Sequence, residues 1–304
     1  MPVITTQALT KRYPGVTALD GLTVDIGEGV TGLVGANGAG KSTLIKILLG
    51  LSDATAGTAQ VLGHDISADA AALRRRVGYM PEHDCLPGNM SATELVVHLA
   101  RMSGLPRDAA RERTADTLRH VGLSEERYRP IGGYSTGMKQ RVKLAQALVH
   151  DPEIVFLDEP TNGLDPAGRD EMLGLVRRIH TDFGISVLVT SHLLGELERI
   201  CDDVVVIDAG VLLRSSSVAD FTQASAELAV ELTADADTAA EALAGAGLTV
   251  RREGRLLLAT LDGDETYDRV RDVSADHGFG LVRLERRRHH IADVFEEESA
   301  DVIA

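Results

Sequence analysis

The chain has 304 residues, of which 44% are hydrophobic and 25% charged, and its formal net charge is −15. This length and apolar content predict one full-sized folded domain and a smaller second one, and they exclude a chain that is disordered by composition. A surface this acidic repels phosphate backbones, which argues against nucleic acid as a partner.

The sequence also bears on where the protein works. Cys85 and Cys201 lie far apart and in no metal-binding or redox spacing, which indicates reduced cytosolic thiols. Residues 1–8 contain no charged segment followed by an apolar one, so we expect no signal peptide. Because no apolar run approaches the length of a membrane-spanning helix, we expect a protein that works from the cytoplasm.

Short apolar runs predict the strands of an α/β domain over residues 1–215. They lie at 3–9, 22–26, 30–34, 60–62 and 77–80, and then at 154–157, 185–189 and 204–207. The later runs are continuously apolar, as expected of parallel strands that are covered on both faces. Between about 88 and 150 the apolar period is helical, and Pro106 and Ser135 stand where helices can begin. We therefore predict a helical subdomain inserted into the α/β domain.

From residue 216 onward the composition shifts towards Ala, Glu, Asp and Arg. The patterns predict strands at 227–232, 248–252, 255–261 and 280–285 and helices at 238–246 and 265–277. This β-α-β-β-α-β order predicts a small α+β, ferredoxin-like domain over 216–304. A last short helix is expected at 291–298.

Residues 35–42 read G-A-N-G-A-G-K-S, between the apolar run 30–34 and a helix-like run at 43–49. Glycines let the backbone curl so that successive N–H groups point at an anion, and the following helix adds the positive end of its dipole. Lys41 can then bridge the β- and γ-phosphates of a nucleotide, and Ser42 can offer its hydroxyl to Mg²⁺. The alternative, a glycine-rich turn that only connects strand to helix, is disfavoured by these flanks. The residues expected to contact the nucleotide are Gly35, Ala36, Asn37, Gly38, Ala39, Gly40, Lys41, Ser42 and Thr43.

Two later runs end in polar side chains. The run 154–157 leads into Asp158 and Glu159, and a carboxylate at the end of a buried strand can hold Mg²⁺, which is the role expected of Asp158. Glu159 can polarise the attacking water as general base. His192 follows the run 185–189 and can hydrogen-bond the γ-phosphate. Alone, such residues are usually structural or solvated, but their occurrence with the glycine-rich loop favours catalytic roles.

The sequence Y-S-T-G-M-K-Q-R at 134–141 opens the last helix of the helical insert. Ser135 as N-cap, followed by Thr136 and the small Gly137, leaves backbone N–H groups free for a second anion. On physical grounds alone, an ordinary capped helix is the favoured alternative.

In this order the motifs resemble those of the ATP-binding cassette ATPases, the motor subunits of ABC transporters, over about residues 4–214. The resemblance implies a P-loop NTPase fold, with a mixed sheet core and a helical subdomain. It implies that 35–43 form the Walker A loop, 154–159 the Walker B strand with the catalytic Glu159, and 162–165 the D-loop. His192 matches the switch histidine, and Ser135, Thr136 and Gly137 fall in the signature that binds phosphate in trans. Tyr13 stands where the family stacks an aromatic ring on adenine.

Several positions depart from the family pattern. The signature, usually Leu-Ser-Gly-Gly-Gln, has Tyr134, Thr136 and Met138 at three of its positions. Glu82 replaces the Q-loop glutamine, where an anionic oxygen can still bind Mg²⁺ or its water but adds a charge beside the phosphates. These variants, and I-A-D-V-F at 291–295, resemble those of ABC-2-type exporters, the drug, sodium or polysaccharide efflux group.

The resemblance implies ATP and Mg²⁺ as cofactors and a nucleotide site shared between two chains, as a homodimer or a paralogue heterodimer. It also implies a separate transmembrane permease, which this chain serves as a peripheral subunit at the cytoplasmic face of the cell membrane. The permease is expected to dock on the helical insert and the Glu82 loop. Residues 216–304 are expected to have a regulatory or dimer-stabilising role.

Two alternatives remain open. One is a soluble cassette ATPase of translation or DNA repair, which the single cassette and the insert of ordinary length disfavour. The other is a nucleotide-gated regulatory module without useful hydrolysis. Intact Lys41, Asp158, Glu159 and His192 disfavour the second.

Overall fold

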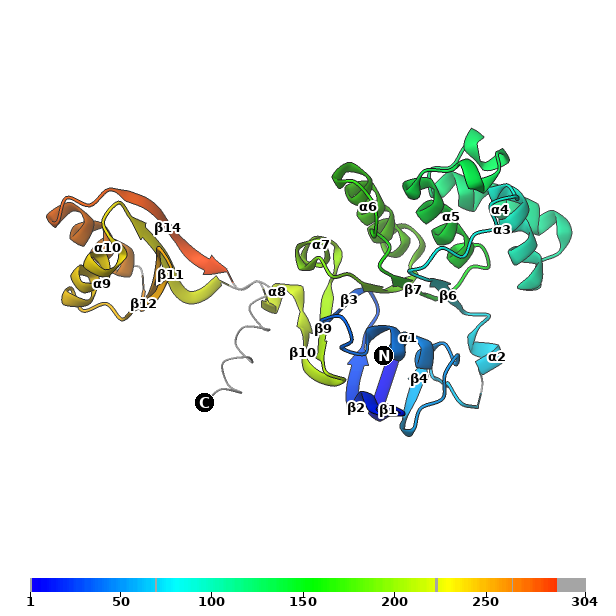
Figure 1. The fold of residues 1–304 in the computed structure, drawn as a ribbon, viewed down its shortest axis with the longest axis horizontal. Coiled ribbons are helices and arrows are strands. Elements are labelled where there is room, and N and C mark those ends of the chain that lie inside the picture. Colours follow the sequence, from blue (N-terminus) through cyan, green and yellow to red (C-terminus); the bar gives the residue numbers. More distant parts are fainter. Residues whose placement is uncertain (1, 69, 222–223, 264, 289–304) are drawn as a thin grey trace. The chain divides into compact units, whose positions relative to one another are not determined.

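The computed structural model describes residues 2–68, 70–221, 224–263 and 265–288, without the side chains of 224–226 and 288. The helix predicted at 291–298 lies outside these residues. The chain divides into an N-terminal unit, residues 1–218, and a C-terminal unit, residues 219–304 (Figure 1). The division lies beyond the predicted boundary at residue 215, because strand β10 (Val211–Ser217) stays paired with β9 (Asp203–Asp208) through Ser217.

A six-stranded sheet of order β10-β9-β3-β8-β7-β6 forms the centre of the N-terminal unit. Its remaining strands are β3 (Val30–Val34), β6 (Val77–Met80), β7 (Ile154–Asp158) and β8 (Ser186–Thr190). All residues of β3, β7 and β8 are buried, which explains their continuous apolar runs. Every neighbouring pair is parallel except β9 with β10. The carboxyl ends of β3, β8 and β7 therefore meet at one edge of the sheet.

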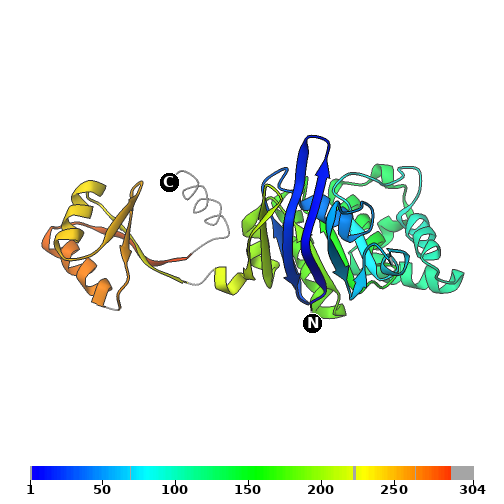
Figure 2. The same cartoon turned by 90° about the horizontal axis from the view of Figure 1, so that it is seen from below.

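A second, antiparallel sheet of order β2-β1-β4-β5 packs near the first. It consists of β1 (Ile4–Tyr13), β2 (Val16–Ile26), β4 (Ala56–Val61) and β5 (His64–Asp65). The long hairpin of β1 and β2 is clear in Figure 2. One apolar cluster joins the two sheets through helix α1 (Lys41–Leu48) and includes the fully buried Leu9, Leu44 and Phe156. This packing fixes α1, and with it the loop that precedes α1.

The helical insert contains α3 (Ala92–Met102), α4 (Arg107–His120) and α5 (Thr136–Leu148), joined by the 3₁₀ turns η1 (Glu125–Tyr128) and η2 (Ile131–Gly133). Ser91 and Glu94 form a capping box at the start of α3, in which each side chain accepts the other's backbone N–H. Pro106 and Ser135 directly precede α4 and α5, at the two positions that the sequence indicates. The other helices of this part of the chain are α2 (Ala70–Leu73), α6 (Pro166–Phe183), α7 (Leu194–Ile200) and α8 (Val218–Phe221).

The C-terminal unit has the element order β-α-β-β-α-β. Its elements are β11 (Ala224–Leu232), α9 (Ala236–Gly245), β12 (Val250–Glu253), β13 (Leu256–Thr260), α10 (Glu265–Asp276) and β14 (Leu281–Arg288). The sheet order is β12-β13-β11-β14 with every pair antiparallel, the arrangement of a split βαβ unit. A separate apolar cluster packs the sheet against both helices, with Leu228, Leu243 and Val270 fully buried.

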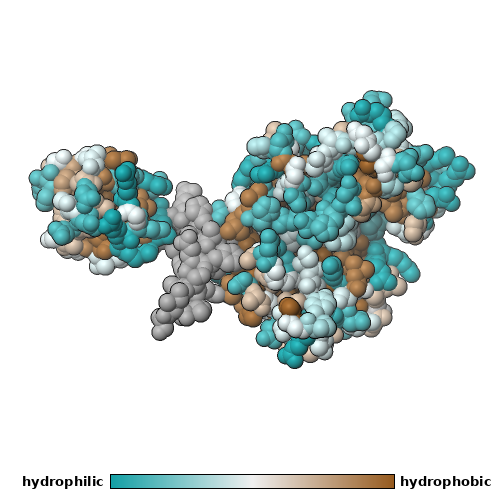
Figure 3. Space-filling view, viewed as in Figure 1, coloured by the Kyte–Doolittle hydropathy of each residue, from teal (hydrophilic) through white to brown (hydrophobic). Residues whose placement is uncertain are grey.

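Hydrophilic and hydrophobic side chains are mixed on the surface of the N-terminal unit. Figure 3 shows hydrophilic residues spread over the drawn face of the N-terminal unit, with hydrophobic ones in small groups. Within the ranges that the structure describes, no helix is both long enough and apolar enough to cross a bilayer.

Because each unit has its own apolar core, we predict that the chain ending at Val218 folds by itself. It should unfold in a single cooperative transition, because its apolar core is complete without the C-terminal unit. Thermal unfolding of the two chains side by side measures this. A truncated chain that is aggregated or melts without cooperativity would show that the two cores depend on each other.

Candidate functional site

The glycine-rich loop joins the end of β3 to the start of α1, as the sequence predicts. Gly38 and Gly40 have φ of 90° and 106°, in the left-handed region that glycine adopts readily. A Cβ at Gly40 would lie 2.4 Å from the Ala18 carbonyl oxygen, and one at Gly35 would lie 2.4 Å from the Ile207 carbonyl oxygen. Glycine is therefore required at both positions, and the backbone can curl closely over an anion.

Lys41 is buried at the first position of α1. Its Nζ donates to the carbonyl oxygens of Gly35 and Ala36, at 2.7 and 3.1 Å. The ammonium group thus lies inside the curve of the loop, where it can exchange these carbonyls for phosphate oxygens.

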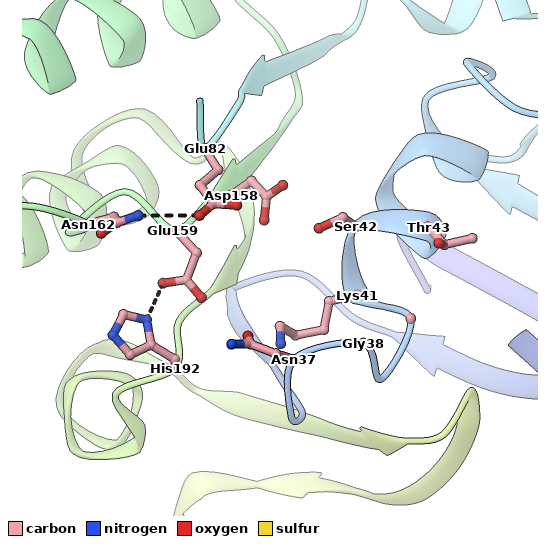
Figure 4. A pocket seen from close by; sticks show the side chains of 11 residues that line it. Asn37, Gly38, Lys41, Ser42, Thr43, Glu82, Asp158, Glu159, Asn162 and His192 are labelled. Atoms are coloured by element: carbon pink, nitrogen blue, oxygen red, sulfur yellow. Dashed lines mark hydrogen bonds and ion pairs between the residues drawn. The ribbon is translucent and has the colours of Figure 1, made fainter. Parts of the chain in front are cut away.

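The loop forms one wall of a pocket of about 390 Å³, a volume typical of small-molecule sites (Figure 4). The opposite wall comes from the carboxyl ends of β6, β7 and β8 and the loops that follow them. The lining residues are Asn37, Gly38, Gly40, Lys41, Ser42, Thr43, Glu82, Asp158, Glu159, Asn162 and His192. The structure thus brings together the predicted phosphate loop, both predicted carboxylates and the predicted histidine.

Glu159 leaves the line of strand β7. Its φ is 50°, a left-handed conformation that is uncommon for a residue with a side chain. The turn directs its carboxylate towards His192, whose Nδ1 lies 2.8 Å from Glu159 Oε2 (Figure 4). An ionised carboxylate only accepts hydrogen bonds, so the proton of this contact belongs to His192 Nδ1.

This contact restricts what His192 can do. With Nδ1–H given to Glu159, the Nε2 atom of the neutral ring carries a lone pair and cannot donate to a phosphate oxygen. His192 can bind a phosphate through Nε2 only when the ring carries a second proton.

Glu82 also lines the pocket, in the loop after β6, and its Oε1 accepts from Asn162 Nδ2 at 3.3 Å. The backbone of this loop is held by Lys143, whose Nζ donates to the carbonyl oxygens of Pro81 and Glu82 at 2.7 and 2.8 Å. Lys143 lies on α5 and is 3% exposed, and its burial lowers the pKa of the ammonium. Burial of the Tyr79 hydroxyl disfavours its charged form and, together with the negative charge of Asp158, raises the pKa of Tyr79 to about 12.

The pocket offers oxygen ligands suited to Mg²⁺. The Ser42 hydroxyl and the carboxylates of Asp158 and Glu82 all line it, and hard oxygen donors are the ligands that this ion takes. Among the described residues, no group of three or more His, Cys, Asp or Glu could hold a metal ion alone. The donor set therefore fits an ion that is bound by one or two carboxylates and completed by phosphate oxygens and water.

Ser135, Thr136 and Gly137 do not reach this pocket. They line a second one, of about 560 Å³, together with Gly163, Leu164 and Asp165. Ser135 is the N-cap of α5, and its Oγ accepts a hydrogen bond from the Met138 N–H at 3.3 Å. One of the backbone N–H groups at the start of this helix is therefore already bonded within the chain. The two predicted anion sites of the chain are thus separate.

Tyr13 lies elsewhere too. It ends β1, is 43% exposed and does not line the first pocket, and the Lys11 ammonium lies 5.0 Å from its ring centroid. Its contact with adenine remains a prediction.

Sequence reasoning missed two contributors to the site. Asn162 lies in the segment that the motifs assign to the D-loop, and Lys143 lies within the predicted helical insert. A lysine on the apolar face of an amphipathic helix is the sequence signal for a residue such as Lys143.

Comparisons with known proteins identify the family of this chain. The model of the ABC transporter family matches residues 19–162. The chain is 36% identical over 256 residues to the daunorubicin/doxorubicin resistance ATP-binding protein DrrA of Streptomyces peucetius, covering 82% of this chain and 77% of that protein. It is 33% identical over 305 residues to the daunorubicin resistance ATP-binding protein DrrA3 of Streptomyces coeruleorubidus, covering 98% and 96%.

Among solved structures, CbiO1 of Clostridium perfringens, part of the ABC transporter complex CbiONQ, superposes with a TM-score of 0.67 at 28% identity, covering 72% of this chain and 90% of that one. These matches confirm the family and the P-loop cassette fold that the motifs predict. The alignment with DrrA3 extends over 98% of this chain, and the family model matches its nucleotide-binding part. The chain therefore belongs to the ATP-binding subunits of ABC transporters, and it is an ATPase.

Proposed function

We propose that this chain is the motor of an exporter of the ABC-2 type, in which MgATP binding and hydrolysis between two cassettes drive a separate transmembrane permease. The observation that carries the proposal is the separation of the two anion sites. One pocket holds Lys41, Asp158 and Glu159, and the other holds Ser135 and Gly137. A nucleotide that needs both sets of donors must lie between two chains, so its binding favours a closed dimer and its hydrolysis releases that dimer.

In the proposed reaction, the loop amides and Lys41 bind the phosphates. Ser42, Asp158 and Glu82 would hold Mg²⁺, which would neutralise charge on the phosphates. Glu159 takes a proton from the attacking water as the bond between the γ-phosphorus and the bridging oxygen breaks and ADP leaves. His192 binds the γ-phosphate through Nε2 when its ring carries both protons. Ser135, Thr136 and Gly137 of the other chain close the site.

Export of a drug-like or polymeric cargo is supported by the motif variants around Glu82 and Thr136. Two relatives named for daunorubicin resistance point the same way. The chain would lie at the cytoplasmic face of the membrane and contact the transmembrane permease through its helical insert and the Glu82 loop. Co-purification of the tagged chain with a multi-span membrane protein encoded beside it tests this pairing. Recovery with ribosomes or repair complexes instead would favour the soluble ATPase.

For residues 219–304 we propose a dimer-stabilising or regulatory role. A relative that aligns over 98% of this chain also spans this region, so it is not peculiar to this sequence. The chain ending at Val218 tests the role: its nucleotide-dependent dimerisation should weaken. Unchanged dimerisation and turnover would remove the support for this role.

Replacing Lys41 with alanine should weaken binding of MgATP about 10- to 100-fold, because charge-assisted hydrogen bonds to the phosphates are lost. Titration with a fluorescent ATP analogue measures the affinity. Lys46→Ala is the matched control, since Lys46 lies on the same helix with its side chain exposed. Equal affinity of the Lys41 variant and the wild-type chain would contradict the phosphate-binding role.

Replacing Glu159 with glutamine should lower kcat roughly 100- to 10,000-fold, the range expected when a general base is lost. ATP binding should remain, because glutamine keeps the size of the side chain. The variant should accumulate as an ATP-bound dimer, which size-exclusion chromatography with light scattering detects. Turnover at the wild-type rate would exclude Glu159 as the base.

Replacing Glu82 with glutamine restores the usual Q-loop residue and removes one negative charge from the pocket. The Mg²⁺ concentration that gives half-maximal nucleotide binding should rise about tenfold, because a carboxylate attracts the ion more strongly than an amide does. Asp84→Asn is the control, since Asp84 lies in the same loop but pairs with Lys139 outside the pocket. An unchanged Mg²⁺ dependence would mean that Glu82 does not face the ion.

A further inference from the structure

Thr190 makes two hydrogen bonds that join the two carboxylate residues of the site. It is the last residue of β8 and is fully buried. Its Oγ1 donates to Asp158 Oδ1 at 2.8 Å and accepts from the backbone N–H of Glu159 at 3.0 Å. One hydroxyl therefore contacts both the expected metal ligand and the expected general base.

The position of Thr190 follows from the sheet. Strands β7 and β8 are parallel, and their ladder ends at the pair of Asp158 and Thr190. Beyond this pair, Glu159 turns into the left-handed region, so its N–H leaves the ladder without the acceptor that a continuing strand would supply. A buried amide without an acceptor is unfavourable, and the Thr190 hydroxyl accepts its hydrogen.

The single proton of the hydroxyl fixes the direction of both bonds. Since the Glu159 N–H can only donate, the Thr190 oxygen accepts from it and gives its own proton to Asp158. Asp158 Oδ1 is thereby held by a donor inside the protein. Its other oxygen, Oδ2, has no hydrogen bond to the residues that the structure describes, and Asp158 lines the pocket.

The same sheet contains a buried threonine that makes no such bonds. Thr31 lies on the neighbouring strand β3 and is 1% exposed. Its Oγ1 has no hydrogen-bond partner within the described part of the chain. Packing alone thus accommodates a buried threonine here without any hydrogen bond, so the two bonds of Thr190 are not a general result of burial.

We propose that Thr190 is a positioning residue for ATP hydrolysis: its hydroxyl sets the orientation of the Asp158 carboxylate and stabilises the turn that directs Glu159 towards His192. The proposal rests on the proposed roles of Asp158 as metal ligand and Glu159 as base. It predicts that loss of the hydroxyl affects Mg²⁺ binding through Asp158 and the catalytic step through Glu159 together.

The test compares Thr190→Val, which removes the hydroxyl at nearly constant shape, with Thr190→Ser, which keeps it. For Thr190→Val we expect kcat to fall roughly 10- to 100-fold, the effect of losing a hydrogen bond to a charged group. The Mg²⁺ concentration for half-maximal binding of a fluorescent ATP analogue should rise at least about threefold, by the same argument. Thr190→Ser should stay within about threefold of the wild-type chain in both measurements, because the hydroxyl remains.

Thr31→Val is the matched control on the neighbouring strand, and it should match the wild-type chain because no hydrogen bond is lost. If Thr190→Val does not fold, Thr190→Ala against Thr190→Ser isolates the same hydroxyl. Wild-type values of kcat and Mg²⁺ dependence in the valine variant would overturn the proposal. So would a loss in the serine variant as large as that in the valine variant. Failure of the wild-type chain to bind MgATP would instead refute the proposed function.

Discussion

The parallel pairing of β3, β8 and β7 is the constraint on which the site depends. Parallel strands end at the same edge of a sheet, so three segments that are far apart in the sequence deliver their last residues to one place. Each strand is followed there by a segment of the site. The phosphate loop follows Val34, the turn at Glu159 follows Asp158, and the segment with His192 follows Thr190. The buried apolar runs make these ends rigid, which lets a left-handed glutamate persist beside them.

The charge of the pocket supports the proposal that ATP binds together with a divalent cation. Three carboxylates line it, and Lys41 is the one Lys or Arg among its described lining residues. Free ATP would bring several negative charges towards Glu82, Asp158 and Glu159, and a bound Mg²⁺ would compensate for that repulsion. In a chain whose net charge is −15, the proposed preference for the magnesium complex would thus follow from the charge of the pocket.

Much of the fold could be predicted from the sequence, where local patterns are strong. The runs 30–34 and 77–80 are strands β3 and β6 with the same bounds, because buried parallel strands are continuously apolar and end at turn residues. Strand β10 was missed, since its serine-rich half is half-exposed at the sheet edge and resembles a linker.

For the candidate site, the sequence predicts most of the motif residues but not the contacts between residues that lie far apart in the chain. Six residues of the predicted loop line the pocket together with Glu82, Asp158, Glu159 and His192. The other predicted contacts do not line it: Gly35, Ala36, Ala39, Tyr13 and the Ser135 segment. The bonds of Thr190 to Asp158 and of Lys143 to Pro81 join residues 32 and 62 positions apart, and no local pattern reveals such pairings.

The buried Lys143 links helix α5 to the loop that contains Glu82. It lies two turns along the helix that Ser135 caps, and its ammonium group donates hydrogen bonds to the backbone carbonyls of Pro81 and Glu82. A rotation of that helix must either drag the Glu82 backbone along or break two hydrogen bonds of a buried cation. In the proposed dimer, Lys143 would therefore link the Glu82 side of one chain's nucleotide pocket to the signature surface that the same chain presents to its partner.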